Sequence, residues 1–189
     1  MEKFLVEISA RHMHLSKEAV DALFGEGYEL VNKKDLSQPG QYACEEKVIV
    51  RGPRGELKMS VLGPVRKNVQ VEVSLTDART LGVEAMIRES GDIAGTSGIL
   101  LVGPCGEYEI KEGLIAAKRH IHMTTADAER LGVNNGEVVS VAVESADRSL
   151  VFGDTVVRVS DKFALAMHID TDEANAAGIK GSAMGKIVK

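Results

Sequence analysis

The sequence contains no tryptophan, and aromatic residues make up only 4% of its 189 residues. Its formal net charge is −5, so it lacks both the basic surface and the aromatic stacking platforms that nucleic-acid binders use. It also lacks any apolar run of the roughly 18 residues that a membrane-spanning helix needs. We therefore expect no nucleic acid and no membrane as partner, whereas short basic pairs such as Lys33-Lys34 favour a small anionic metabolite.

Cysteine is scarce as well. Cys44 and Cys105 stand far apart and outside any C-x-x-C spacing, which argues against a disulfide framework or a cysteine zinc knuckle and predicts two reduced thiols. The motifs G-x-G-x-x-G and G-x-S-x-G are missing, so nicotinamide and serine-hydrolase chemistry have no support. Residues 1–12 show no basic region followed by an apolar segment, so we expect no signal peptide and a cytoplasmic protein.

Strand signals dominate what is present. Two pairs of strand-like runs flank Gly-Pro turns at 52–55 and 103–106 and are typical of β-hairpins. Further runs rich in β-branched residues predict strands at 68–75, 136–145, 149–160 and 163–169.

Helical signals are short. Four segments begin with a residue suited to an N-cap, and three of them end at a glycine. The expected helices, with caps Ser16, Thr76, Thr124 and Thr171, cover 16–24, 76–82, 124–132 and 171–178. The length allows one or two domains, and the pattern predicts a mostly β chain with short capping helices.

An internal repeat is visible in the sequence. Residues 10–23, "ARHMHLSKEAVDAL", match residues 118–131, "KRHIHMTTADAERL", at an offset of 108. Residues 70–83, "QVEVSLTDARTLGV", match residues 166–179, "AMHIDTDEANAAGI", at an offset of 96. The repeat therefore duplicates the H-x-H unit and aligns a glutamate with the last of the five histidines.

These repeat positions give each half the same kind of candidate metal site. Side chains two apart on a strand share a face, so H-x-H presents two imidazoles together. A further Glu or His completes a ligand set that suits Zn²⁺ and leaves a coordination position open. The ordinary alternative is a pair of histidines in a turn, but the duplication favours metal. The candidate ligands are His12, His14 and Glu72 in one half, and His120, His122 and His168 in the other.

Two other features lie near these positions in the sequence. Arg66, in "GPVRK", precedes Glu72 by six residues, and an arginine fork beside a metal is suited to phosphate or carboxylate. The segment "SGDIAGTSG" at 90–98 is glycine-rich but lacks phosphate-loop spacing. We interpret it as a flexible connection between the repeats.

Five segments together form a more specific pattern: "SARHMHLS", "LGPVRKNVQVEVSLTDARTLG", "SGDIAGTSG", "KRHIHM" and "MHIDTDEANAAG". From about residue 5 onward the chain resembles the PduL-type phosphate acyltransferases, the phosphate propanoyltransferase family. The resemblance implies an enzyme that interconverts a short-chain acyl-CoA, propanoyl-CoA or acetyl-CoA, plus phosphate with acyl phosphate plus CoA. It also implies two small β-barrels, approximately residues 1–10 plus 123–189 and residues 11–122, with the N-terminal strand completing the barrel formed by the C-terminal part.

The resemblance further implies roles for individual residues. A dinuclear zinc site would lie between the barrels, one ion on each triad, although other divalent ions suit the same ligands. Arg66 matches the phosphate-binding arginine of the family, and Ser9, Lys34 and Asn175 match positions that contact CoA. Many members carry an N-terminal extension that targets a bacterial microcompartment. We see no such extension here, and the preferred acyl chain, the pathway and the oligomeric state, including a homo-oligomer, stay open.

Two alternatives from other classes remain at this point. A cupin-like metal enzyme would use Glu18 and Gly25 after the first H-x-H, but the second copy has Ala126 where Glu18 would be. A non-catalytic zinc-binding module would use the histidines only to hold structure together. Release of CoA from an acyl-CoA in the presence of phosphate separates both from the acyltransferase.

Overall fold

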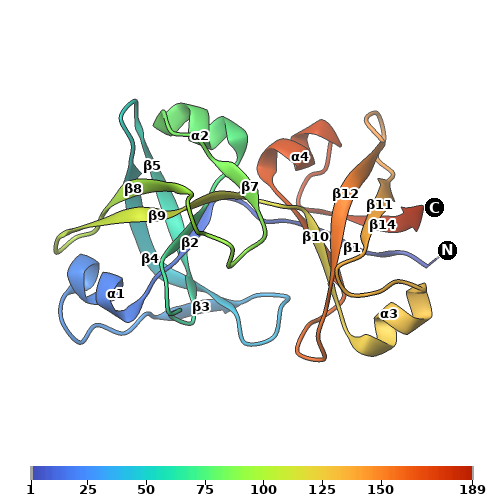
Figure 1. The fold of residues 1–189 in the computed structure, drawn as a ribbon, viewed down its shortest axis with the longest axis horizontal. Helices are drawn as coiled ribbons and strands as arrows, with labels where there is room; N and C mark the ends of the chain where they lie inside the picture. Colours follow the sequence, from blue (N-terminus) through green and yellow to red (C-terminus); the bar gives the residue numbers. More distant parts are fainter. Residues whose placement is uncertain (1, 189) are drawn as a thin grey trace. The chain divides into compact units, whose positions relative to one another are not determined.

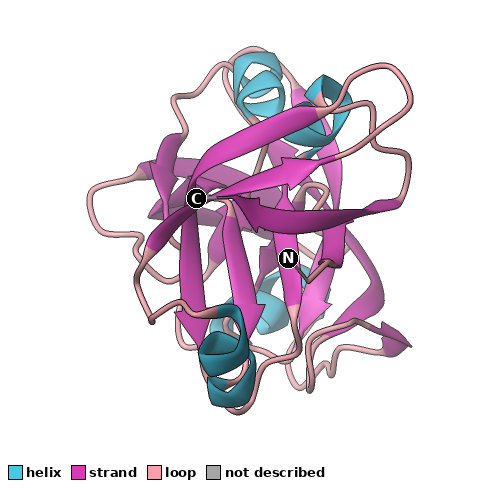
Figure 2. Cartoon of the chain, turned by 90° about the vertical axis from the view of Figure 1, so that its right-hand side faces the viewer, coloured by secondary structure: helices cyan, strands magenta, loops and turns pink. Residues whose placement is uncertain are grey.

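The computed structural model describes residues 2–188, which fall into two compact units. Unit 1 contains the residues up to Ser9, Ser37–Pro39, and the chain from Lys118 onward, and unit 2 contains Ala10–Leu36 and Gly40–Ala117. Strands predominate over four short helices in the described chain (Figures 1 and 2). This agrees with the mostly β class expected from the sequence.

In unit 2, a strand that bears candidate ligands is followed by a capped helix twice, as β2 with α1 and as β6 with α2. They are β2 (His12–His14), α1 (Lys17–Phe24), β3 (Asn32–Asp35), β4 (Tyr42–Arg51), β5 (Glu56–Gly63), β6 (Gln70–Glu72), α2 (Leu75–Leu81), β7 (Met86–Arg88), β8 (Ser97–Val102) and β9 (Glu107–Ala117).

Unit 1 uses fewer elements in a similar order. They are β1 (Phe4–Ile8), β10 (His120–Met123), α3 (Thr125–Leu131), β11 (Val138–Val143), β12 (Leu150–Val159), β13 (Ala166–Ile169), α4 (Thr171–Ala176) and β14 (Ser182–Val188).

Each unit closes a six-stranded barrel with the same pairing scheme. Unit 1 closes in the order β1, β13, β10, β12, β11, β14. Unit 2 closes in the order β9, β6, β2, β5, β4, β8, since β8 pairs with both β4 and β9. Corresponding pairs also agree in direction: the H-x-H strands β2 and β10 each have one parallel neighbour, β5 or β12, and one antiparallel neighbour, β6 or β13.

The two repeats exchange their first strands. β1, which leads into β2 of unit 2, pairs with β13 and β14 of unit 1. β9, which leads into β10 of unit 1, pairs with β6 and β8 of unit 2. The N-terminal strand β1 thus lies in the barrel whose other strands come from the C-terminal part of the chain, and β9 makes the reciprocal exchange.

The expected domain boundary differs from the division into units. Residues 118–122 were expected with the barrel of residues 11–122, whereas in the structure they lie in unit 1. The reason is that β10 forms backbone ladders with β12 and β13 of that unit. The short segment Ser37–Pro39 also belongs to unit 1, where the Gln38 side chain donates to the Ala164 carbonyl and accepts from its N–H.

Two of the four expected helix caps are right and two are wrong. Ser16 and Thr124 cap α1 and α3 as expected. α2 is capped by Ser74 instead of Thr76, and α4 by Asp170 instead of Thr171. In both corrected helices the true cap and the third helical residue form a reciprocal capping box, which satisfies two backbone N–H groups at once.

The ligand strands alternate between the barrel core and the opposite face. Met13, between the two histidines of β2, is fully buried in the core of unit 2, and Ile121 occupies the same place in unit 1. Burying a side chain of this size contributes about 1.5–3 kcal/mol, so each barrel fixes which face its strand turns to the core. The histidines on either side must then share the other face.

None of the helices in residues 2–188 has the length and apolar character needed to cross a bilayer.

Candidate active site

The first candidate metal centre lies in unit 2 and joins two neighbouring strands. His12 and His14 come from β2 and Glu72 from the antiparallel strand β6, where Glu72 is directly opposite His12. One potential ligand atom from each lies within 4.8 Å of those of the others. All three side chains are buried, with 2–9% of their surface exposed.

The backbone fixes the orientation of the His12 ring. Its Nδ1–H donates to the Ala10 carbonyl at 2.9 Å, so the lone pair is on Nε2. Nε2 lies 3.5 Å from Glu72 Oε2. Burial opposes protonation of His12, but the adjacent Glu72 carboxylate favours it, and the pKa of His12 is raised above its ordinary value.

His14 has the opposite electrostatic situation. Burial, followed by the positive charges at His12 and Arg66, lowers the pKa of His14 to about 3. The ring is therefore neutral at pH 7, the form that coordinates a metal. Its Nδ1 atom is buried and has no hydrogen-bond partner among residues 2–188, and such an atom calls for an explanation.

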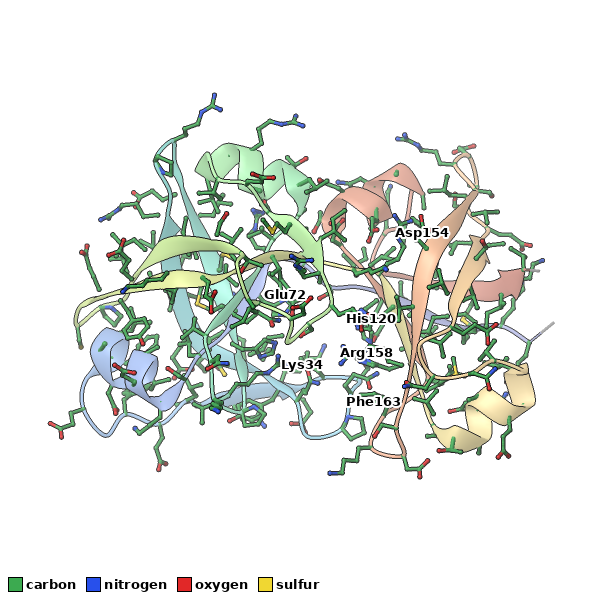
Figure 3. All side chains as sticks on the ribbon, viewed as in Figure 1. Lys34, Glu72, His120, Asp154, Arg158 and Phe163 are labelled. Atoms are coloured by element: carbon green, nitrogen blue, oxygen red, sulfur yellow. The ribbon has the colours of Figure 1, made fainter. Side chains whose placement is uncertain are left out.

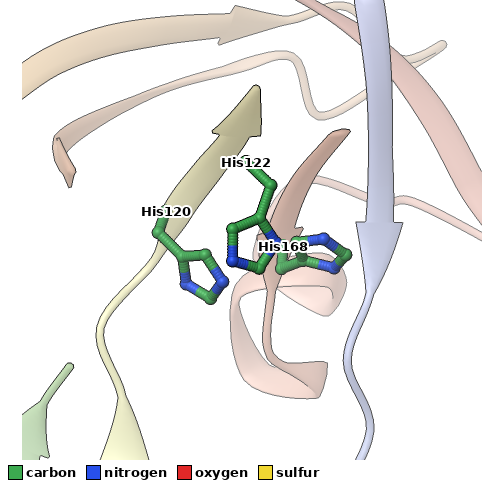
Figure 4. A group of neighbouring side chains, drawn as sticks. All are labelled: His120, His122 and His168. Carbon is green, nitrogen blue, oxygen red and sulfur yellow. The ribbon is translucent and has the colours of Figure 1, made fainter. Parts of the chain in front are cut away.

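The second candidate centre, in unit 1, has the same construction (Figure 4). His120 and His122 lie on β10, and His168 on β13 is directly opposite His120. The Nδ1–H of His120 donates to the Lys118 carbonyl at 2.9 Å, as His12 does to Ala10. The three rings lie within 4.6–5.3 Å of one another, centroid to centroid.

Aromatic and charged residues of unit 1 surround this second centre (Figure 3). The Phe163 ring packs against His122 at a centroid distance of 4.2 Å, and Arg158 is the β12 residue directly opposite His122. Glu7, on β1, is opposite His168, with its Oε2 atom 4.0 Å from His168 Nδ1. Ser37 donates a hydrogen bond to the same Glu7 oxygen.

The residues of both centres fit a divalent metal of the borderline class. His₂Glu and His₃ are ligand sets found in catalytic zinc sites, and three protein ligands leave room for a substrate atom. A metal would also account for the buried Nδ1 of His14, which lacks any hydrogen bond in the described chain. The six residues that the repeat singled out are thus brought together as two triads.

Arg66 lies beside the first triad. It follows β5, and its backbone N–H donates to the Leu15 carbonyl at 2.8 Å, which attaches it to the residue after the H-x-H strand. Its positive charge opposes protonation of both His12 and His14, as expected for a guanidinium close to them. Its Nη1 donates to Ser90 Oγ over a long 3.4 Å.

Two polar residues of this site were missed by the sequence analysis. Gln70, buried on β6, donates to Glu72 Oε1 at 2.6 Å and to Ser90 Oγ at 2.8 Å. The second is Ser90, in the segment 90–98 that was expected to connect the repeats. In the structure residues 90–96 lie between β7 and β8 and residues 97–98 begin β8, all within unit 2. Gln70 had one available signal, because it stands two residues before Glu72 and so shares its face.

The three positions expected to contact CoA lie on separate elements. Ser9 follows β1, and its N–H donates to the Ile169 carbonyl at 2.8 Å. Lys34 is exposed on β3 in unit 2, and Asn175 is exposed on α4 in unit 1. Within unit 1, no hydrogen bond joins Ser9 to Asn175 among the residues described.

The cupin-like ligand set does not form. Glu18 lies in the first turn of α1, where it favours the helix dipole, and it contacts the Tyr108 hydroxyl, whose pKa is raised by burial and by that carboxylate. The carboxylate that joins His12 and His14 is Glu72.

Comparison with known proteins identifies the family of this chain. The family model for phosphate propanoyltransferase matches residues 5–180. The chain is 55% identical to a phosphate propanoyltransferase of Listeria monocytogenes, covering 97% of this chain and 86% of that protein. It is 55% identical to the one of Clostridioides difficile, covering 97% and 88%, and 53% identical to the one of Salmonella typhimurium, covering 90% and 81%. The chain therefore belongs to the phosphate propanoyltransferase family and is an acyltransferase.

Proposed function

We propose that this protein interconverts propanoyl-CoA or acetyl-CoA plus phosphate with the acyl phosphate plus CoA, and that each triad holds one Zn²⁺. A phosphate oxygen attacks the thioester carbonyl carbon, the new C–O bond forms, and the C–S bond breaks as CoA leaves as a thiolate. The step needs no oxidant and no covalent enzyme intermediate. Bound zinc would supply Lewis acidity for the developing oxyanion and a soft partner for the thiolate.

The side chains of unit 2 have distinct tasks in this proposal. His12 and His14 present Nε2 and Nδ1 from one strand face, and the neutral state of His14 keeps its lone pair available at pH 7. Arg66 binds phosphate through parallel N–H groups and holds it for attack. Its position beside the triad, on a backbone hydrogen bond to Leu15, is the observation that supports this role.

CoA contacts are assigned from the resemblance. The exposed Lys34 offers a cation for the phosphates of CoA, while Ser9 and Asn175 offer a hydroxyl and an amide. The duplicated triad, in a chain of this family, is the single observation that carries the whole proposal.

Release of free thiol tests the reaction. The zinc-loaded protein is incubated with propanoyl-CoA or acetyl-CoA, with and without phosphate, and the thiol is measured with a chromogenic disulfide. We expect release that depends on phosphate and is accompanied by acyl phosphate. Release at the same rate without phosphate would indicate a thioesterase, and no release with either substrate would contradict the proposed function.

A further inference from the structure

Gln70 is a buried residue whose side-chain amide contacts the first triad at Glu72. It is neither a carboxylate nor an imidazole, the two ligand types of that triad. It is 3% exposed and lies on β6 directly opposite His14. The equivalent residue of unit 1, directly opposite His122, is Ala166. The barrel therefore accepts alanine at this position, and a glutamine is not required for the fold.

Three hydrogen bonds fix the Gln70 amide. Its Oε1 accepts from the Gly91 N–H at 2.7 Å. Its Nε2 donates to Glu72 Oε1 at 2.6 Å and to Ser90 Oγ at 2.8 Å. Since a backbone N–H can only donate, Gly91 determines which end of the amide is oxygen, and the NH₂ end must face Glu72.

This bond distinguishes the two oxygens of the Glu72 carboxylate. Oε1 is engaged by Gln70, whereas Oε2 lies 3.5 Å from His12 Nε2. We propose that Gln70 is a positioning residue that holds Glu72 by Oε1 so that Oε2 is presented as the metal ligand. This inference rests on the proposed metal site and names a residue of its outer shell.

The side chain beside Glu72 differs from the side chain beside His168, and each suits the chemistry of its neighbour. Glu72, a carboxylate, has an amide N–H donor beside it in Gln70. His168, an imidazole, has a carboxylate beside it in Glu7, at 4.0 Å. The equivalent of Glu7 in the other half, at offset 108, is Ile115, which is opposite Glu72. The neighbouring side chain thus differs between the two units in step with the third ligand, which supports a role for Gln70 that is specific to Glu72.

The test isolates the first triad in a full-length His120→Ala/His122→Ala parent. Zinc affinity is measured by competition with a chromophoric chelator in the parent and in two variants added to it. Gln70→Ala introduces the residue that unit 1 carries at this place, and Gln70→Met keeps the volume but removes the hydrogen bonds. We expect both to weaken zinc binding roughly 10- to 100-fold, the usual effect of removing an outer-shell partner.

Gln38→Ala in the same parent is the matched control, because it also removes a buried glutamine whose amide makes two hydrogen bonds. It is expected to leave the zinc affinity unchanged. Zinc binding by Gln70→Ala and Gln70→Met as tight as in the parent would overturn the positioning role, and so would loss of folded structure in both. Absence of zinc from the parent would instead contradict the proposed metal site, so the two failures are distinguishable.

Discussion

At the scale of single residues, Arg66 is the side chain that we propose for phosphate binding and not for metal binding. Its charge lies near the first triad, but arginine is not a metal ligand and has no acceptor atom. The two functions should therefore respond differently to its removal.

Arg66→Ala is expected to lower kcat/KM for phosphate roughly 10- to 100-fold, the loss of a charge-assisted hydrogen bond or two. The zinc content, measured by elemental analysis, should stay at the wild-type level. Lys67→Ala is the control, because Lys67 is the adjacent cation and is exposed. Unchanged kinetics in Arg66→Ala would remove this residue from the phosphate site.

The two thiols should differ sharply in reactivity. Both are free; Cys44 is buried on β4, and Cys105 is exposed in the turn before β9. Burial, together with the nearby Glu46 carboxylate, raises the pKa of Cys44 to about 11. At pH 8 Cys44 is thus almost entirely protonated as well as covered, and the thiolate is the reactive form.

Iodoacetamide at pH 8 should therefore modify the native protein at Cys105 and leave Cys44 intact. Peptide mapping by mass spectrometry identifies the modified site, and unfolding in guanidinium should expose both. Labelling of Cys44 at the rate of Cys105 in the native protein would contradict the burial described here.

At the scale of elements, the helix that follows each third ligand begins with a capping box, and one acidic residue of each box pairs with an arginine. Asp77, in the box of α2, accepts a hydrogen bond from Arg11 Nη1 at 2.6 Å and forms an ion pair with it. Glu173, in the box of α4, pairs with Arg119 at 2.8 Å. Arg11 and Arg119 each precede the first histidine of an H-x-H unit. In both units an ion pair therefore joins the residue before the H-x-H strand to the helix that follows the third ligand.

Ser74→Ala is expected to destabilise the protein by about 0.5–2 kcal/mol, the usual cost of losing an N-cap. Ser74 Oγ accepts from the Asp77 N–H at 3.1 Å and is buried. Thr76→Ala, at the cap position expected from the sequence, should cost less because Thr76 lies inside the first turn and is exposed. Urea unfolding followed by circular dichroism compares them, and an equal or larger loss for Thr76→Ala would contradict the assigned cap.

The wrong caps show a limit of local pattern. "SLTD" offers both Ser74 and Thr76 as caps, and only the box formed by Ser74 with Asp77 decides between them. At α1 and α3 the caps expected from the sequence, Ser16 and Thr124, are the caps in the structure. Helix starts could thus be predicted within two residues, and the choice depended on a reciprocal hydrogen bond.

At the scale of the whole molecule, the repeat predicted more than local propensity did. The offset of 96 aligned Glu72 with His168, and in the structure each is directly opposite the first histidine of its triad. The exchange of β9 was not predicted, since pairing between strands distant in sequence leaves no local signal. Gln70 was missed because the repeat aligns it with Ala166. A comparison of the two halves therefore gave no sign of a shared polar position there.

The central claim is that the repeat builds one metal centre in each unit. The most direct measurement is the zinc content per chain, by elemental analysis after dialysis, of the wild type and of His12→Ala/His14→Ala and His120→Ala/His122→Ala. One zinc ion on each of the two triads predicts about two zinc ions per chain in the wild type and about one in each variant. A wild type without metal, or variants that keep the full wild-type content, would contradict the claim.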